Sequence, residues 1–164
     1  MSNIRLKRSK KWTQTDFPSL QFPKSDKLLN NFKTDDHMPK EPAHKINVEV
    51  KSAYIGEHSI PTEGHFVFSY TICIQNHGSV AAKLITRHWV ITDADGNEQE
   101  VFGEGVVGKQ PYLRPGEQFE YTSGTVLETP VGYMQGHYQM ISEDGTPFKT
   151  LITPFTLSQP NQLH

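Results

Sequence analysis

Hydrophobic and polar residues alternate with a period of two over most of the chain after residue 45. The longest alternation covers residues 66–75, where aromatic and branched side chains occupy every second position. A strand that buries one face shows this period, whereas an amphipathic helix repeats every 3.6 residues. No stretch after residue 45 keeps the helical period. The alternation also predicts strands at 46–51, 84–93, 98–102, 118–123, 132–142 and 147–157.

Turn-forming residues separate the predicted strands. Asp95-Gly96 and Asp144-Gly145 are strong signals for hairpin turns. Other turns are expected at 61–64, 76–79 and 113–116. Seven to eight short strands at such spacing predict an all-β fold, an antiparallel β-sandwich with a mostly irregular N-terminal extension. On one face the strand at 84–93 is expected to carry Ile85, Arg87, Trp89 and Ile91, and Trp89 is expected to lie between the sheets.

Charge divides the chain into two parts that the net charge of −2 conceals. Residues 1–45 hold ten basic and five acidic residues, a net charge of +5, whereas 46–164 hold six and thirteen, a net of −7. Prolines interrupt residues 1–45, and only 25–32 could form a short helix. We therefore predict a disordered basic extension at 1–45 and a folded domain at 46–164. Alternatively, the extension is an arm that binds a polyanion or a partner protein, and Met38 is an alternative start that would remove it.

The single cysteine, Cys73, excludes a disulfide within the chain and suits a reducing compartment. No run of residues reaches the roughly 18 apolar residues that a membrane-spanning helix needs, and the first residues lack the apolar core of a secretory signal. We therefore expect a cytoplasmic protein without a membrane span. The basic first eleven residues leave an organelle transit peptide as an alternative, although they show no clear amphipathic period.

The most distinctive motif is Gly103-Glu104-Gly105-Val106-Val107-Gly108, which has the G-x-G-x-x-G spacing of dinucleotide-binding loops. That function requires a helix directly after the glycines. Pro111 and Pro115 follow too closely for a helix to form. The motif therefore predicts an exposed loop between two strands, flanked by Glu104 and Lys109. It is either a tight connection or a recognition loop for an anion or a partner.

Two neighbouring features could complete a site beside this loop. Arg87 shares a face with Trp89, so it either pairs with a carboxylate or carbonyl in the core or acts as an anion clamp. Phe119 and Tyr121 share a face, and the stretch 121–124 supplies hydroxyls that form either a bulge or a polar lining. The candidate residues for binding a ligand or partner are Gly103, Glu104, Gly105, Gly108, Lys109, Arg87, Tyr121, Ser123 and Gly124.

Metal and catalytic motifs are absent from the sequence. Of eight histidines, His88 and His137 lie in predicted strands and could meet across a sheet, but no recognised metal signature contains them. No P-loop or nucleophile elbow is present. We therefore predict no catalytic residues, no metal site, no cofactor and no enzymatic activity.

Several runs from residue 46 to 164 together resemble the ApaG (CorD) family. The runs are at 87–92, 100–108, 110–111, 115–117, 121–124, 128–130 and 134–138, with Leu113. The resemblance implies an immunoglobulin- or fibronectin-III-like sandwich in a bacterial cytoplasmic protein associated with cobalt resistance and magnesium efflux. It also implies that related domains act as interaction modules in larger eukaryotic proteins, and it carries over no catalytic residue. The first forty or so residues lie outside it, and a start at Met38 would give an ordinary length for the family.

Two functions from different classes remain open at this point. The first is a non-enzymatic module that recognises a protein through the glycine loop and the neighbouring sheet edge. The second is a protein that binds phosphate or pyrophosphate, or responds to a divalent cation, directly in cation homeostasis. Nucleic acid is an expected partner only through the basic extension.

Overall fold

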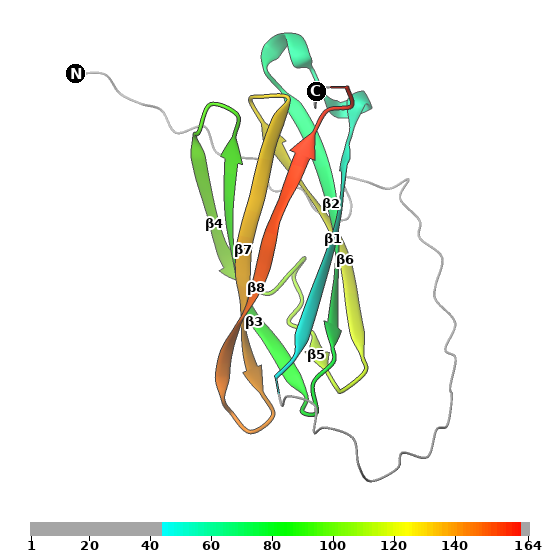
Figure 1. Ribbon diagram of the computed structural model, residues 1–164, viewed down its shortest axis with the longest axis vertical. Coiled ribbons are helices and arrows are strands. Elements are labelled where there is room, and N and C mark those ends of the chain that lie inside the picture. Colours follow the sequence, from blue (N-terminus) through cyan, green and yellow to red (C-terminus); the bar gives the residue numbers. More distant parts are fainter. Residues whose placement is uncertain (1–43, 162–164) are drawn as a thin grey trace, which may run out of the picture.

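A computed structural model describes residues 44–161, in which eight strands form two antiparallel sheets that pack face to face (Figure 1). The strands are β1 (Ile46–Tyr54), β2 (Phe66–Asn76), β3 (Ala82–Asp93), β4 (Glu98–Glu104), β5 (Tyr112–Leu113), β6 (Gln118–Leu127), β7 (Val131–Ser142) and β8 (Pro147–Ser158). Two short 3₁₀ turns, η2 (Gly56–His58) and η3 (Pro61–Glu63), join β1 to β2. The predicted all-β sandwich and its number of strands are confirmed. The predictions for the extension, the 25–32 helix and Met38 lie outside the described residues.

One sheet has the order β1-β2-β6, and the other has the order β4-β3-β7-β8, with β5 also paired to β3. All of these pairings are antiparallel. β1 of the smaller sheet packs against β8 of the larger one, and β4 lies at the other end of the larger sheet from β8, on the left of Figure 1. Among the described residues, the terminal strands of the two sheets are β1, β6, β4 and β8; β1 and β8 pack on each other, which leaves β4 and β6 as the open edges.

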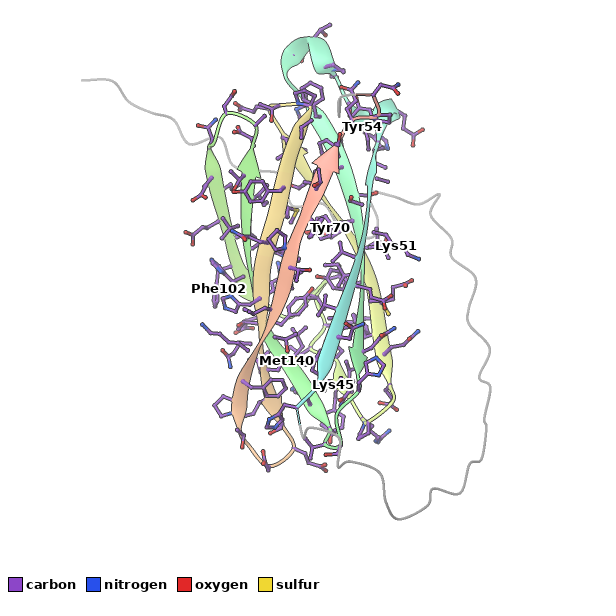
Figure 2. The ribbon with its side chains drawn as sticks, in the orientation of Figure 1. Lys45, Lys51, Tyr54, Tyr70, Phe102 and Met140 are labelled. Carbon is purple, nitrogen blue, oxygen red and sulfur yellow. The ribbon has the colours of Figure 1, made fainter. Side chains whose placement is uncertain are left out.

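Trp89 of β3 forms the centre of the core between the sheets. Its side chain is 2 % exposed, and its ring makes edge contacts with Tyr70, Tyr138 and Phe155. Figure 2 shows Tyr70 pointing from β2 into the space between the layers. Aromatic rings prefer such edge-to-face contacts because the positive ring edge meets a negative ring face. The predicted burial of Trp89 is confirmed.

The predicted face of β3 is wrong at Ile85. The register between β3 and β7 shifts between Leu84 and Thr86, so β3 contains one extra residue there. Such a bulge reverses the inward and outward alternation on its two sides. Leu84 is consequently fully buried and Ile85 is only half-buried, while Trp89 and Ile91 face the core as expected.

The two predicted Asp-Gly hairpins are confirmed. Gly96 and Gly145 both have positive φ angles, +84° and +86°, which glycine adopts without a steric penalty. In the first turn the Asp93 carboxylate accepts hydrogen bonds from Asn97, through both its backbone and side-chain nitrogens. These bonds lower the pKa of Asp93, with the Asn97 side chain as the largest cause.

Candidate functional site

The glycine motif is half strand and half turn. Gly103 and Glu104 are the last residues of β4, and Gly105 and Val106 are buried. The prediction of an exposed loop over the whole motif is therefore wrong. Glu104 and the residues of the tip and beyond, 107–110, are exposed, whereas Gly103 is half-buried. The next element in the chain is β5 and not a helix, as the prolines predicted.

The tip is a two-residue turn between Val106 and Lys109. Their backbones exchange two hydrogen bonds, of 2.8 and 2.9 Å. Both central residues have positive φ, 44° at Val107 and 77° at Gly108, which defines a type I′ turn. Glycine accepts this conformation easily, but a β-branched residue does not. Val107 is therefore strained, and its side chain is 37 % exposed.

The three glycines of the motif differ in what a side chain at their position would contact. A Cβ at Gly105 would collide with the Lys109 carbonyl oxygen and lie 2.9 Å from its carbon, whereas at Gly108 it would meet open space. A Cβ at Gly103 would lie 3.1–3.2 Å from three atoms of the Arg87 guanidinium. Three glycines therefore do not by themselves indicate recognition. An exposed loop, as expected from the sequence, would tolerate Gly105→Val without loss of stability. The structure predicts instead that this substitution destabilises the fold.

Arg87 supports the turn from inside the sandwich. It lies on the core face of β3 opposite Gly103, and its Nη1 donates to the carbonyls of Glu104 at 2.9 Å and Gly105 at 2.7 Å. Of the two alternatives for Arg87, the structure shows pairing with carbonyls. An anion clamp is disfavoured because Nη1 is already engaged. Arg87 thus holds the end of β4 against β3.

The loop amides are also engaged within the protein. The N–H of Gly105 donates to the Ile85 carbonyl at 2.8 Å, and those of Val106 and Lys109 donate to each other's carbonyls. A phosphate cradle needs several free backbone N–H groups that point at one anion. Two N–H groups of the motif and that of the adjacent Lys109 are unavailable for that purpose, so the glycine spacing does not reproduce the chemistry of a phosphate loop.

Tyr121 and Ser123 belong to the core and not to the loop. Tyr121 is buried, its hydroxyl bonds to the hydroxyl of Tyr138, and Ser123 bonds to Tyr70. Burial, and then the neighbouring tyrosines, raise the pKa of Tyr121 well above its usual value. The register between β2 and β6 is regular through Gly124, so the predicted bulge is wrong. Burial therefore makes Tyr121 inaccessible to a ligand, whereas Ser123 and Gly124 are half-buried within β6.

An open groove that the sequence did not predict lies beside Lys109. Its volume is about 670 Å³. The turn tip, β5 and the beginning of β6 contribute the lining residues Lys109, Gln110, Pro111, Tyr112, Leu113, Glu117, Gln118 and Phe119. The Lys109 ammonium lies 6.0 Å from the centre of the Phe119 ring, at the outer limit of a cation–π contact. Tyr112 is 45 % exposed, so the groove presents an accessible aromatic side chain.

His88 and His137 meet on the outer face of the larger sheet. They are directly opposite in the register of β3 and β7, with ring centres 5.1 Å apart, and His88 Nε2 lies 3.0 Å from a Glu100 carboxylate oxygen. Burial, and then Lys149 and His88, lower the pKa of His137. Within residues 44–161, no three His, Cys, Asp or Glu side chains come together with a geometry that could hold a metal ion. No helix in that range is long and apolar enough to cross a membrane.

Two packed antiparallel sheets with a groove at one free edge define a β-sandwich domain of the immunoglobulin and fibronectin-III class, as expected. The sequence profile of the ApaG domain matches residues 56–142, and the chain belongs to this family. It is 60 % identical over 121 residues to Protein ApaG of Thiobacillus denitrificans, covering 74 % of this chain and 95 % of that protein. With Protein ApaG of Xanthomonas euvesicatoria the identity is 53 % over 127 residues, covering 77 % of this chain and all of that protein.

A solved structure gives the same result. The crystal structure described as the putative ApaA protein from Bordetella pertussis superposes with a TM-score of 0.72 at 48 % identity, covering 75 % of this chain and 99 % of that one. The resemblance seen in the sequence is thereby confirmed for the family and the fold.

Proposed function

We propose that this chain is a non-enzymatic module that binds a protein in the groove between the turn tip, β5 and β6. The observation that carries the proposal is the position of the groove directly beside the free edge of β6. Its lining combines the apolar and aromatic side chains of Pro111, Tyr112, Leu113 and Phe119 with polar ones, among them Lys109 and Glu117, and Glu117 is paired with Arg114 at 3.6 Å. Peptide-binding sites commonly combine these two elements, because a strand edge supplies hydrogen bonds while a pocket selects side chains.

An extended segment of the partner adds to the edge of β6 beside Gln118 and Phe119. Its apolar side chain packs on Tyr112, and an acidic residue meets Lys109. Tyrosine suits this role because it gives a large contact area at a small cost in conformational entropy. The folded domain has a net negative charge, and Lys109 is one of its six basic residues. Its positive charge orients an acidic segment of the partner in the groove.

The strain at Val107 supports a functional role for the adjacent tip. A β-branched residue with positive φ persists only when its surroundings impose it, and such residues cluster at binding sites. The alternative of direct phosphate or pyrophosphate binding has less support, since three of the loop amides are already bonded. The association with cobalt resistance and magnesium efflux implied by the family would then operate through the bound protein.

Affinity capture with matched variants tests the proposal. Tyr112→Ser and Lys109→Glu change exposed groove residues, and Tyr133→Ser changes a similarly exposed tyrosine of β7 as the control. We expect both groove variants to lose a partner that wild type and Tyr133→Ser retain, at unchanged melting temperature. Equal capture by all four proteins would contradict recognition in the groove.

A further inference from the structure

The free edge of β4 carries an acidic and aromatic pattern that the proposed function does not use. Glu98, Glu100, Phe102 and Glu104 occupy alternate positions of β4 and therefore project from the same face. β4 is the outermost strand on the left of Figure 1, and among the described residues it pairs only with β3. Phe102 is 68 % exposed and lies on the outside of the sandwich (Figure 2).

Charged side chains on an edge strand usually prevent another strand from pairing there. The glutamates are consistent with that role, but a largely exposed phenylalanine between them is not. Phe102 lies beside His88, whose ring centre is 6.5 Å from its own, and His88 in turn bonds to Glu100. The edge therefore repels most strands but offers an apolar contact and a fixed carboxylate to a strand of opposite charge.

The chain itself contains a segment of this chemistry. Residues 4–11 read Ile-Arg-Leu-Lys-Arg-Ser-Lys-Lys, with five cations and no acid, in the part of the chain whose net charge is +5. The part from residue 46 onwards has a net charge of −7. On one face of an extended segment Leu6 would be followed by Arg8 and Lys10, an apolar residue and two cations in alternate positions, as Phe102 is preceded by Glu100 and Glu98 on β4.

We propose that residues 4–10 of this chain bind along the free edge of β4 as an additional antiparallel strand. One register matches three of the four positions, with Leu6 opposite Phe102, Arg8 opposite Glu100 and Lys10 opposite Glu98, while Ile4 lies opposite Glu104. Opposite charges and apolar side chains placed directly across from one another are the pairs that stabilise antiparallel strands. The surface used is β4, so the proposal is independent of the groove beside β6.

The connection to the folded domain permits this contact. The described chain begins at His44, whose ring stacks on Phe148 at 4.6 Å, near the start of β8. β8 and β4 are the two ends of one four-stranded path, three strand spacings or roughly 14 Å apart. Residues 11–43 join the two sites, and a random chain of that length spans about 30 Å. The proposed register places residue 10 beside Glu98, about eight residues along the sheet from the level of Phe148 and one strand beyond β4, so the tether spans roughly 33 Å in all. That distance is close to the average span of a random chain of this length, at which the local concentration of the segment is highest.

Paramagnetic relaxation in the full chain tests the proposal. A nitroxide is attached to Ser2→Cys in a Cys73→Ser background, which removes the only natural cysteine. We expect the amide signals of β4 to lose intensity while those of β1, in the other sheet, do not. In 1 M salt the loss should disappear, because the screening length falls from about 10 Å at 0.1 M to about 3 Å.

Charge exchange supplies the control. Glu98→Lys with Glu100→Lys should abolish the intensity loss at β4, and adding Arg8→Glu with Lys10→Glu should restore it. Glu63→Lys with Glu143→Lys, two exposed acids outside β4, should leave it unchanged. Uniform or absent broadening would overturn the proposal. So would broadening of ¹⁵N-labelled chains by separate spin-labelled chains, which would show that the segment binds a second copy.

Discussion

Gly105 and Gly108 differ in what a side chain would meet, and this difference predicts unequal effects of the same substitution. Both residues have positive φ, so alanine at either position incurs a conformational penalty of about 1 kcal/mol. At Gly108 nothing lies within 4 Å of the new Cβ, and no further cost arises. Gly108→Ala should therefore lower the free energy of unfolding by about 1 kcal/mol.

At Gly105 the new Cβ collides with the Lys109 carbonyl. That carbonyl accepts the 2.8 Å hydrogen bond from Val106, whose side chain is fully buried. Displacing the Lys109 carbonyl weakens this hydrogen bond, which is worth about 1 kcal/mol. The accompanying shift of Val106 in the core costs about 1 kcal/mol more. Gly105→Ala should therefore cost about 3 kcal/mol in total.

Urea unfolding followed by tryptophan fluorescence measures both values, because Trp89 lies in the core. The prediction requires the midpoint to fall clearly further for Gly105→Ala than for Gly108→Ala, at an unchanged slope. Equal destabilisation would refute the argument that packing against Lys109, and not backbone conformation alone, requires glycine at 105. If Gly105→Ala leaves the free energy of unfolding unchanged, Gly105 would instead lie in an exposed loop, as expected from the sequence.

Three further predictions concern the core, the turn tip and the acid side of the pH profile. Trp89→Ala should cost about 3–5 kcal/mol in urea unfolding, and in a Trp12→Phe protein, where Trp89 is the remaining tryptophan, acrylamide should quench the fluorescence slowly; quenching as fast as for free indole would contradict burial. Val107→Asn, which creates the Asn-Gly pair that type I′ turns prefer, should stabilise the fold by about 1 kcal/mol, and a lower melting temperature would argue against strain at Val107. The bonds that Asp144 accepts, the one from Ser142 above all, lower its pKa to about 2, so its stabilising effect should be complete above pH 4 and lost as the pH falls towards 2. Asp144→Asn should flatten the dependence of thermal stability on pH in that range, and an unchanged profile would contradict the assignment.

The alternating pattern was sufficient to predict every strand except the two-residue β5, the two Asp-Gly hairpins and the burial of Trp89, because these depend on side chains within one or two neighbouring strands. β5 is too short to show an alternation and overlaps the turn expected at 113–116. The inward position of Leu84 could not be predicted, since the bulge beside it arises from the pairing of β3 with β7. The prediction that the glycine motif at 103–108 is an exposed loop was wrong for a similar reason. Gly103 makes room for Arg87, a residue of the adjacent strand, and spacing along one segment carries no information on that contact.

The buried position of Tyr121 shows the same limit. Its alternation with Phe119 was recognised, but the sequence could not tell whether the shared face points into the core or towards a site. The groove was missed because it joins residues on both sides of the turn at 113–116, and their neighbourhood depends on how β5 and β6 approach in space. An exposed tyrosine and a phenylalanine flanking a Pro-Gly turn are the signal that could have indicated it.

Site-specific photocrosslinking tests recognition in the groove most directly. A benzophenone side chain replaces Tyr112 in one protein and Tyr133, the exposed tyrosine of β7, in another. We predict that one and the same protein is crosslinked from position 112 and not from 133, and that Lys109→Glu abolishes the product. A crosslink formed equally from both positions, or only from 133, would contradict the proposal that this domain binds its partner in the groove beside β6.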